Sequence, residues 1–218
     1  MDVRRVPRTG FASASSRSAG GRSTFGPRWQ RSALGGIAVA GVIGDAAWKI
    51  PMGLPGHRAL GWLTILVVAR LVGGRGWAAL VGIVSAALVL ALGISPDGVW
   101  GVAQYAIAGV LLDVALTVRP SLGSNGIKLA LLGAIVLLTV GWIAPLGQSL
   151  GAGVPLAYLW PSLVQVAGGG VSRLVVLDLV FGASAGVLGW MFAAALNVGR
   201  DRIGMLSGVP LAVRGRAN

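Results

Sequence analysis

The stretch "ALGWLTILVVARLVGGRGWAALVGIVSAALVLALGI" (59–94) is apolar along most of its length, and the short sequence "GGRG" (73–76) divides it into two segments. Runs of this composition are typical of membrane-spanning helices, although 59–73 is short for a complete crossing. The glycines around Arg75 favour a turn between the two segments. The stretch therefore predicts two consecutive helices, 59–73 and 76–94, in a lipid bilayer.

The rest of the chain has the same character. Hydrophobic residues make up 55% of the 218 residues and charged residues only 11%, against about 25% in an average soluble domain. The mean hydropathy is +0.81. Further apolar segments occupy 33–50, 99–118, 127–147 and 171–198. The predicted fold class is therefore all-α, a polytopic membrane protein with about six transmembrane helices of roughly 20 residues each.

Lysine and arginine residues predict the orientation, because they are enriched in the cytoplasmic loops of membrane proteins. With the N-terminus in the cytoplasm, fifteen of the 18 basic residues lie inside, and only Lys49, Arg58 and Arg173 lie outside. Both termini are therefore predicted to be cytoplasmic. The expected organisation is a disordered basic arm rich in Arg, Ser and Gly, a six-helix membrane domain and a basic tail, at 1–32, 33–198 and 199–218.

Several functional classes are excluded by what the sequence lacks. It has no cysteine, no phosphate-binding loop and no HExxH motif, so thiolate, nucleotide-driven and zinc-peptidase chemistry lack their residues. The sequence "GASAG" (182–186) lies within an apolar segment, whereas the only histidine, His57, lies in a predicted outer loop. Basic residues flank apolar segments, which argues against nucleic-acid binding. We expect no enzyme activity, no cofactor and no metal site.

Three aspartates fall within the predicted helices, where a charged side chain is costly and usually faces a bundle interior or water. Lys49 follows Asp45 at i+4, and Arg119 lies near Asp113, so both aspartates have a nearby basic residue for a structural ion pair. Asp178 has no basic residue at i+3 or i+4. It is therefore the strongest candidate for ligand contact, while Asp45 can serve either in an ion pair or in a binding site.

Aromatic residues are concentrated in the half of the membrane predicted to be outer. Tyr105 lies there with Tyr158 and five tryptophans, Trp48, Trp62, Trp100, Trp142 and Trp160. Such residues either form an interfacial belt or line a pocket for a flat organic ligand. The predicted outer loop "GLPGHR" (53–58) carries His57 and Arg58, and it is either an ordinary turn or a shaped excursion of the chain.

Small residues recur at helical spacing in two of the predicted helices. The first helix has Gly36, Ala40 and Gly44 at successive i+4 positions, and the last has Gly182 and Gly186. Such strips allow a second helix to approach closely through van der Waals contact. Each strip serves either packing within the chain or the docking of a partner membrane protein.

This pattern resembles the substrate-binding S components of energy-coupling factor (ECF) transporters, which are six-helix membrane proteins of about this length. The resemblance covers 33–198 and is carried by the predicted topology, by the strip on the first helix and by structured outer loops. Two sequences also carry it, "LPGHRALGWLTILVVARLVGGRGWAALVGIVSAAL" (54–88) and "YAIAGVLLDVAL" (105–116).

The resemblance implies a membrane protein of the bacterial inner (plasma) membrane that captures a vitamin or related micronutrient at its outer side. A separate membrane coupling protein and two cytoplasmic ATPases would drive uptake, and Gly36, Ala40 and Gly44 would dock the coupling protein. His57 and Arg58 would lie at the mouth of the pocket. The other pocket residues implied by the resemblance are Asp45, Trp100, Gln104, Tyr105 and Asp178. The partners expected are thus a small molecule, these transporter subunits and the lipid bilayer.

Two other functions remain open at this stage. A membrane scaffold or assembly protein would use the small-residue strips only as interfaces. A stand-alone small carrier without an ATPase partner is expected to show paired half-helices or an internal repeat. The metal-binding members of the resembled family carry an N-terminal Met-His-Ile type site that this chain lacks, which argues against a metal substrate.

Overall fold

A computed structural model describes residues 28–47, 57–95, 98–153 and 171–206, and these residues are helical with no β-strand among them. The helices in chain order are α1 Arg28–Ala47, α2 Ala59–Gly73, α3 Trp77–Ala91, α4 Gly98–Val118, the 3-10 helix η1 Pro120–Ser124, α5 Gly126–Gly141, α6 Ile143–Gly151 and α8 Val171–Leu206. The all-α fold class predicted from the sequence is confirmed for the described residues.

The segment 127–147, which the sequence predicted to be a single helix, contains two helices. In the structure α5 ends at Gly141 and α6 begins at Ile143, with Trp142 between them. Pro145 accounts for this break, because proline has no N–H to donate to the carbonyl four residues earlier, which belongs to Gly141. Two other boundaries also differ, since α1 begins within the predicted arm and α8 continues to Leu206, past the predicted end of the membrane domain.

Three helical segments are long and apolar enough to cross a membrane: α4, the α5–α6 segment Gly126–Gly151, and Leu174–Asn197 within α8. Three others are shorter apolar helices, Ser32–Ala47 of α1, α2 and α3. Large apolar side chains remain on the outside of the bundle, among them Ile37 and Leu131 at 69% and 62% exposure. An apolar exterior of this kind is suited to lipid and not to water.

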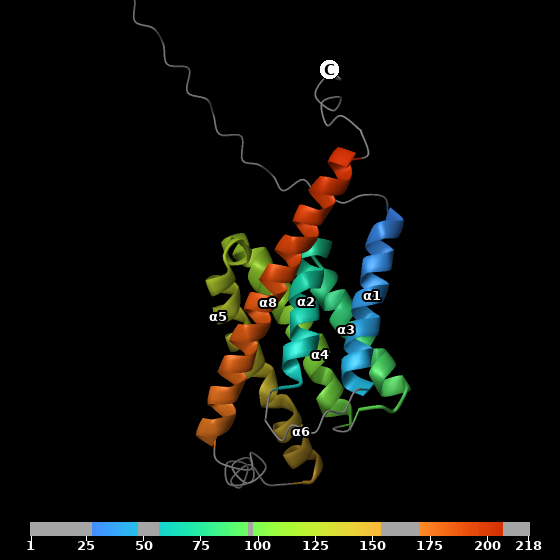
Figure 1. Ribbon diagram of the computed structural model, residues 1–218. Helices are drawn as coiled ribbons and strands as arrows, with labels where there is room; N and C mark the ends of the chain where they lie inside the picture. The colour runs from blue at the N-terminus through green and yellow to red at the C-terminus, as the bar shows by residue number, and fades with distance from the viewer. Residues whose placement is uncertain (1–27, 48–56, 96–97, 154–170, 207–218) are drawn as a thin grey trace, which may run out of the picture.

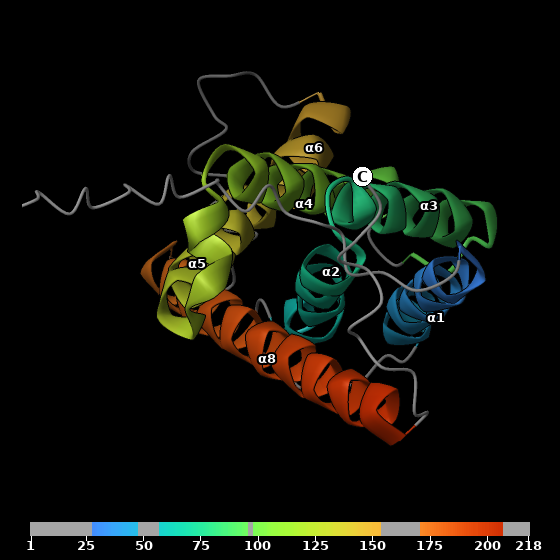
Figure 2. The same cartoon turned by 90° about the horizontal axis from the view of Figure 1, so that it is seen from above.

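Helix α2 lies at the centre of the bundle (Figure 2), where it packs against α1, α3, α4 and α8. Its side chains Leu63, Leu66 and Val67 are completely buried. They belong to a core that also includes Leu112 of α4 and Leu129 of α5. Because α2 is apolar on nearly all sides, it can be enclosed by other helices without leaving polar side chains unpaired.

The two ends of the bundle differ in charge. The start of α1, the α2–α3 turn, η1 and the end of α8 lie at the same end (Figure 1), here named the basic end because it holds Arg70, Arg75, Arg119 and Lys128. The opposite end, named the α6 end, holds α6, the start of α2 and the start of α8. The described helix ends at each side alternate as the sequence predicted, while the number of membrane crossings and the side that faces the cytoplasm stay predictions.

Glycines bring two pairs of helices into close contact. A Cβ atom added at Gly186 of α8 would meet the carbonyl oxygen of Leu129 on α5, and Gly182 faces Gly133 in the same way. Gly82 of α3 likewise faces the backbone of α4 at Tyr105. The strip on the last predicted helix therefore packs within the chain, one of the two roles considered for it.

We predict that Gly186→Ala lowers the apparent Tm of the purified protein by several degrees, because the added methyl group meets backbone that has nowhere to move. Overpacking of this kind costs about 1–3 kcal/mol. Gly36→Ala is the matched control, since no described atom lies within 4 Å of a Cβ there, and alanine should leave the Tm unchanged or raise it. Thermal unfolding in detergent, followed by tryptophan fluorescence, measures both; equal shifts would contradict the assigned packing.

Candidate functional site

Asp113 of α4 is a buried carboxylate that connects three helices at the basic end. Its Oδ1 lies 2.7 Å from Nε of Arg70 on α2. The backbone N–H groups of Gly76 and Ala79, at the start of α3, donate to its two oxygens at 3.0 and 2.6 Å. The aspartate thus satisfies orphan donors at the N-terminus of a neighbouring helix, where a negative charge is favourable.

The sequence placed Asp113 near Arg119, and that pairing is wrong. The two residues are six positions apart, which places them about 120° apart around a helix. Arg119 is also exposed beyond the end of α4, whereas Asp113 is only 7% exposed. Arg70, which also donates to Thr117 Oγ1 at 3.4 Å, is the actual partner. This ion pair is structural and lies outside the candidate binding site.

At the α6 end, the structure brings Asp45, His57 and Arg58 together. The Asp45 carboxylate lies against Gly61 of α2, where any Cβ would meet its Oδ1. Arg58 and His57 lie close enough to interact electrostatically with this carboxylate. Lys49, the ion-pair partner considered for Asp45 in the sequence, lies outside the described residues. Three of the predicted site residues therefore form one polar cluster between α1 and α2.

Tyr105 of α4 packs against Trp62 of α2 in an edge-to-face arrangement, with ring centroids 5.2 Å apart and an interplanar angle of 76°. Such pairs are favourable beyond the area they bury. Sequence reasoning placed Trp62 in the outer half and did not include it among the site residues. Its position one turn after Arg58 was the signal that could have identified it.

Trp100 and Gln104 lie one helical turn apart on α4 near the α6 end. Trp100 does not face α2 as Tyr105 does. The Trp100 ring lies against Gly147 of α6, and 41% of the residue is exposed. Gln104 is partly buried. Two neighbouring turns of α4 thus contact α2 on one side and α6 on the other.

Asp178 of α8 is 3% exposed and lies against Gly141, the last residue of α5. Its Oδ2 atom is buried and has no hydrogen-bond partner among the described residues. A buried carboxylate oxygen without a partner is costly. The break between α5 and α6 places a backbone bend directly beside this group. Asp178 is therefore the side chain at the α6 end with the clearest capacity to accept a hydrogen bond from a ligand.

No three histidine, aspartate or glutamate side chains converge on a metal-binding geometry within the part of the chain that the structure describes. The predicted loop residues 53–56 lie outside that part, as do 154–170. The described candidate residues fall into four groups toward the α6 end: the Asp45 cluster, the Trp62–Tyr105 pair, Trp100 with Gln104, and Asp178.

The strip of Gly36, Ala40 and Gly44 on α1 faces away from the bundle. All three residues are exposed, and no described atom lies within 4 Å of a Cβ built on Gly36 or Gly44. The opposite face of α1 is packed, since Gly35 meets the Trp77 ring and Gly41 meets Ile65. The described part of the chain therefore leaves this strip unfilled.

Comparison of the chain with protein-family models, curated proteins and solved structures finds no match in any of the three. The functional argument therefore rests on the arrangement of these residues.

We predict that Asp113→Ala destabilises the protein by about 3–5 kcal/mol, the usual cost of leaving one member of a buried ion pair alone. Arg119→Gln is the control, because it removes a charge at the same end that is exposed and outside this pair. Thermal unfolding should show a large fall in apparent Tm for the first variant only. A comparable fall for Arg119→Gln would restore the pairing expected from the sequence.

Proposed function

We propose that this protein is the membrane-embedded substrate-binding component of an ATP-driven micronutrient uptake system, of the ECF S-component kind. In this proposal the chain crosses the bacterial inner membrane six times with both termini in the cytoplasm. It is not an enzyme and binds no nucleotide. A membrane coupling protein and two cytoplasmic ATPases supply the energy, and the cargo is a vitamin or a vitamin precursor.

The unfilled strip on α1 is the observation that carries this proposal. Glycines elsewhere in the bundle allow close contact between helices of the same chain, as Gly133 and Gly186 do between α5 and α8. The strip of Gly36, Ala40 and Gly44 has the same composition but faces outward. Close approach through small residues is a main source of helix association in membranes. A partner helix could therefore pack here without any rearrangement of the described bundle.

The residues at the α6 end support a binding role. Asp178 and Asp45 provide carboxylate oxygens, Arg58 provides a cation, and Trp62 with Tyr105 provides aromatic surface. Ligand sites commonly combine a few polar groups with apolar and aromatic walls. If the basic end is cytoplasmic, this combination faces the outside, where a substrate would be captured.

A membrane scaffold or assembly protein is the second candidate, because the exposed strip would serve it equally well. That alternative gives Asp178 no role, although a buried carboxylate without a described partner is expensive to retain. A stand-alone carrier would need neither the strip nor an ATPase partner. Binding of a small molecule therefore separates the first function from the scaffold, and dependence on the strip separates it from the carrier.

We predict that Ala40→Leu abolishes co-purification with a co-expressed coupling protein and ATPase module of the same bacterium, and with it uptake, while substrate binding is retained. The leucine side chain fills the surface where the partner helix must approach. Ala87→Leu on α3 is the matched control, because Ala87 is also exposed but belongs to no small-residue strip. Uptake that survives Ala40→Leu would favour the carrier, and absence of any ligand in either form would favour the scaffold.

We predict that Asp178→Asn weakens substrate binding roughly tenfold or more, the typical effect of losing a hydrogen bond to a charged group. Native mass spectrometry of the protein incubated with a panel of vitamins measures the retained adduct. Asp201→Asn is the control, since Asp201 lies near the end of the same helix, at the basic end. An adduct equally stable in both variants would remove Asp178 from the site.

A further inference from the structure

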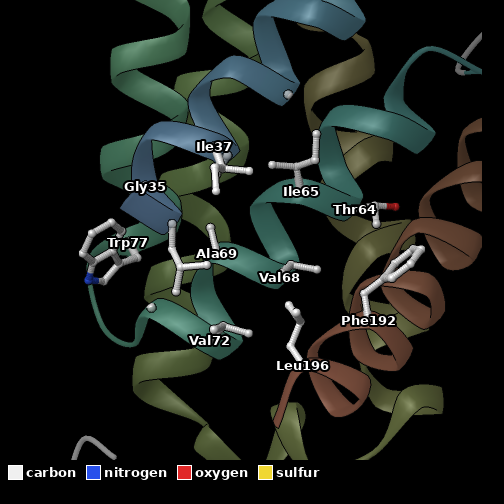
Figure 3. A pocket seen from close by; sticks show the side chains of 14 residues that line it. Gly35, Ile37, Thr64, Ile65, Val68, Ala69, Val72, Trp77, Phe192 and Leu196 are labelled. Atoms are coloured by element: carbon white, nitrogen blue, oxygen red, sulfur yellow. The ribbon is translucent and has the colours of Figure 1, made fainter. Parts of the chain in front are cut away.

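Two cavities of the bundle differ in what lines them. The groove between α1 and α8 has a volume of about 530 Å³ and is lined by residues such as Val68 of α2 and Phe192 of α8 (Figure 3). Thr64 is its one hydroxyl-bearing residue, and that hydroxyl donates to the Leu60 carbonyl within α2. These walls are mostly hydrocarbon and offer little that would fix a polar ligand.

The second cavity, here named the basic pocket, has a volume of about 350 Å³ and lies at the basic end. Its walls come from the end of α2, the α2–α3 turn, the end of α4 and η1. They include Arg70, Arg75, Thr117 and Pro120, and none of the described lining residues is acidic. The volume falls within the range of small-molecule sites. The basic pocket thus combines two arginines and a hydroxyl group in one cavity.

Arg70 is fixed in the wall of the basic pocket by two contacts. Its Nε lies 2.7 Å from Oδ1 of Asp113, and its Nη2 donates to Oγ1 of Thr117 at 3.4 Å. The side chain is only 13% exposed. A guanidinium group has five N–H donors in a planar fork, and these contacts involve two of its three nitrogens. The donors of Nη1 therefore have no partner among the described residues.

Asp113 does not neutralise the basic pocket as a whole. Its two oxygens already accept from two backbone N–H groups at the start of α3, and they also meet Arg70. No other carboxylate side chain is described at this end, because Asp45 and Asp178 lie toward the α6 end. Arg75 is exposed and forms no ion pair with any described residue. The lining therefore carries one positive charge without a described counter-charge.

We propose that the basic pocket binds a phosphate group, with Arg70 and Arg75 as its charged partners and the Thr117 hydroxyl as a further donor. Guanidinium groups match the geometry of phosphate oxygens, and the anion supplies the missing counter-charge. Basic pockets between transmembrane helices bind anionic lipid head groups, so the phosphate belongs either to a lipid or to a soluble compound. The basic pocket lies at the end opposite the candidate site, and the proposal does not rest on the transport function.

The test compares two lipids that differ only in a phosphate group. The full chain, purified in mild detergent, is incubated with equimolar phosphatidic acid and diacylglycerol of identical acyl chains, and the retained lipid is measured by native mass spectrometry. We expect phosphatidic acid to be preferred by several fold. Arg75→Gln should reduce that preference roughly fivefold, the effect of one basic side chain near an anionic lipid, and Arg75→Lys should restore most of it.

Arg119→Gln is the matched control, because this exposed arginine lies at the same end but does not line the basic pocket. Arg70 is left unchanged, since its loss would leave the buried Asp113 carboxylate without its cation and destabilise the fold. An equal effect of Arg75→Gln and Arg119→Gln would mean that the general positive charge of this end attracts the lipid, and would overturn the proposal.

Inorganic phosphate separates the two sources of the ligand. A rise in apparent Tm with phosphate, relative to chloride at the same ionic strength, that Arg75→Gln removes would assign the basic pocket to a soluble phosphate compound. A lipid preference that depends on Arg75 without this rise would assign it to a lipid head group. Absence of both effects in the unmodified chain would overturn the proposal.

Discussion

The buried carboxylate of Asp113 holds the basic end of this bundle together. It binds Arg70 of α2 and accepts from the backbone N–H groups of Gly76 and Ala79, so one side chain on α4 positions two other helices. A buried charge in an apolar bundle is costly unless it is paired. The pairing sets where the α2–α3 turn lies, and with it the register in which Gly82 of α3 meets α4.

The small residues of the bundle fall into two groups, those that pack within the chain and those that are exposed on α1. Gly133, Gly182 and Gly186 pack between α5 and α8, whereas no described atom lies within 4 Å of a Cβ built on Gly36 or Gly44. Charge is separated as well. Arg75 and Arg119 lie at the basic end, while Asp45 and Asp178 lie toward the α6 end together with Arg58. Both separations are expected of the transport component proposed above.

The sequence predicted the helices well because their apolar composition needs no tertiary information, and α2 begins and ends at the predicted residues. The break at Trp142 could have been predicted from Pro145, whose missing N–H is a local property. The partner of Asp113 could not be predicted, because Arg70 lies on another helix and spacing along one helix does not show which helices pack together. The cluster of Asp45 with Arg58 could have been predicted, because the end of one helix and the start of the next lie at the same end of the bundle. The groove between α1 and α8 depends on which helices fail to pack, which no local pattern encodes.

The proposal that the candidate site faces the outside of the cell requires alternate crossing of the membrane, and cysteine accessibility tests this most directly. The chain has no native cysteine, so Arg58→Cys, Arg75→Cys, Ser95→Cys and Ser121→Cys each introduce a single thiol beside α2, α3 or α4. A membrane-impermeant maleimide added to intact cells should label positions 58 and 95, and should label 75 and 121 only after permeabilisation. Labelling of both ends of one helix from the same side would contradict the six crossings, and the reverse pattern would place the α6 end in the cytoplasm.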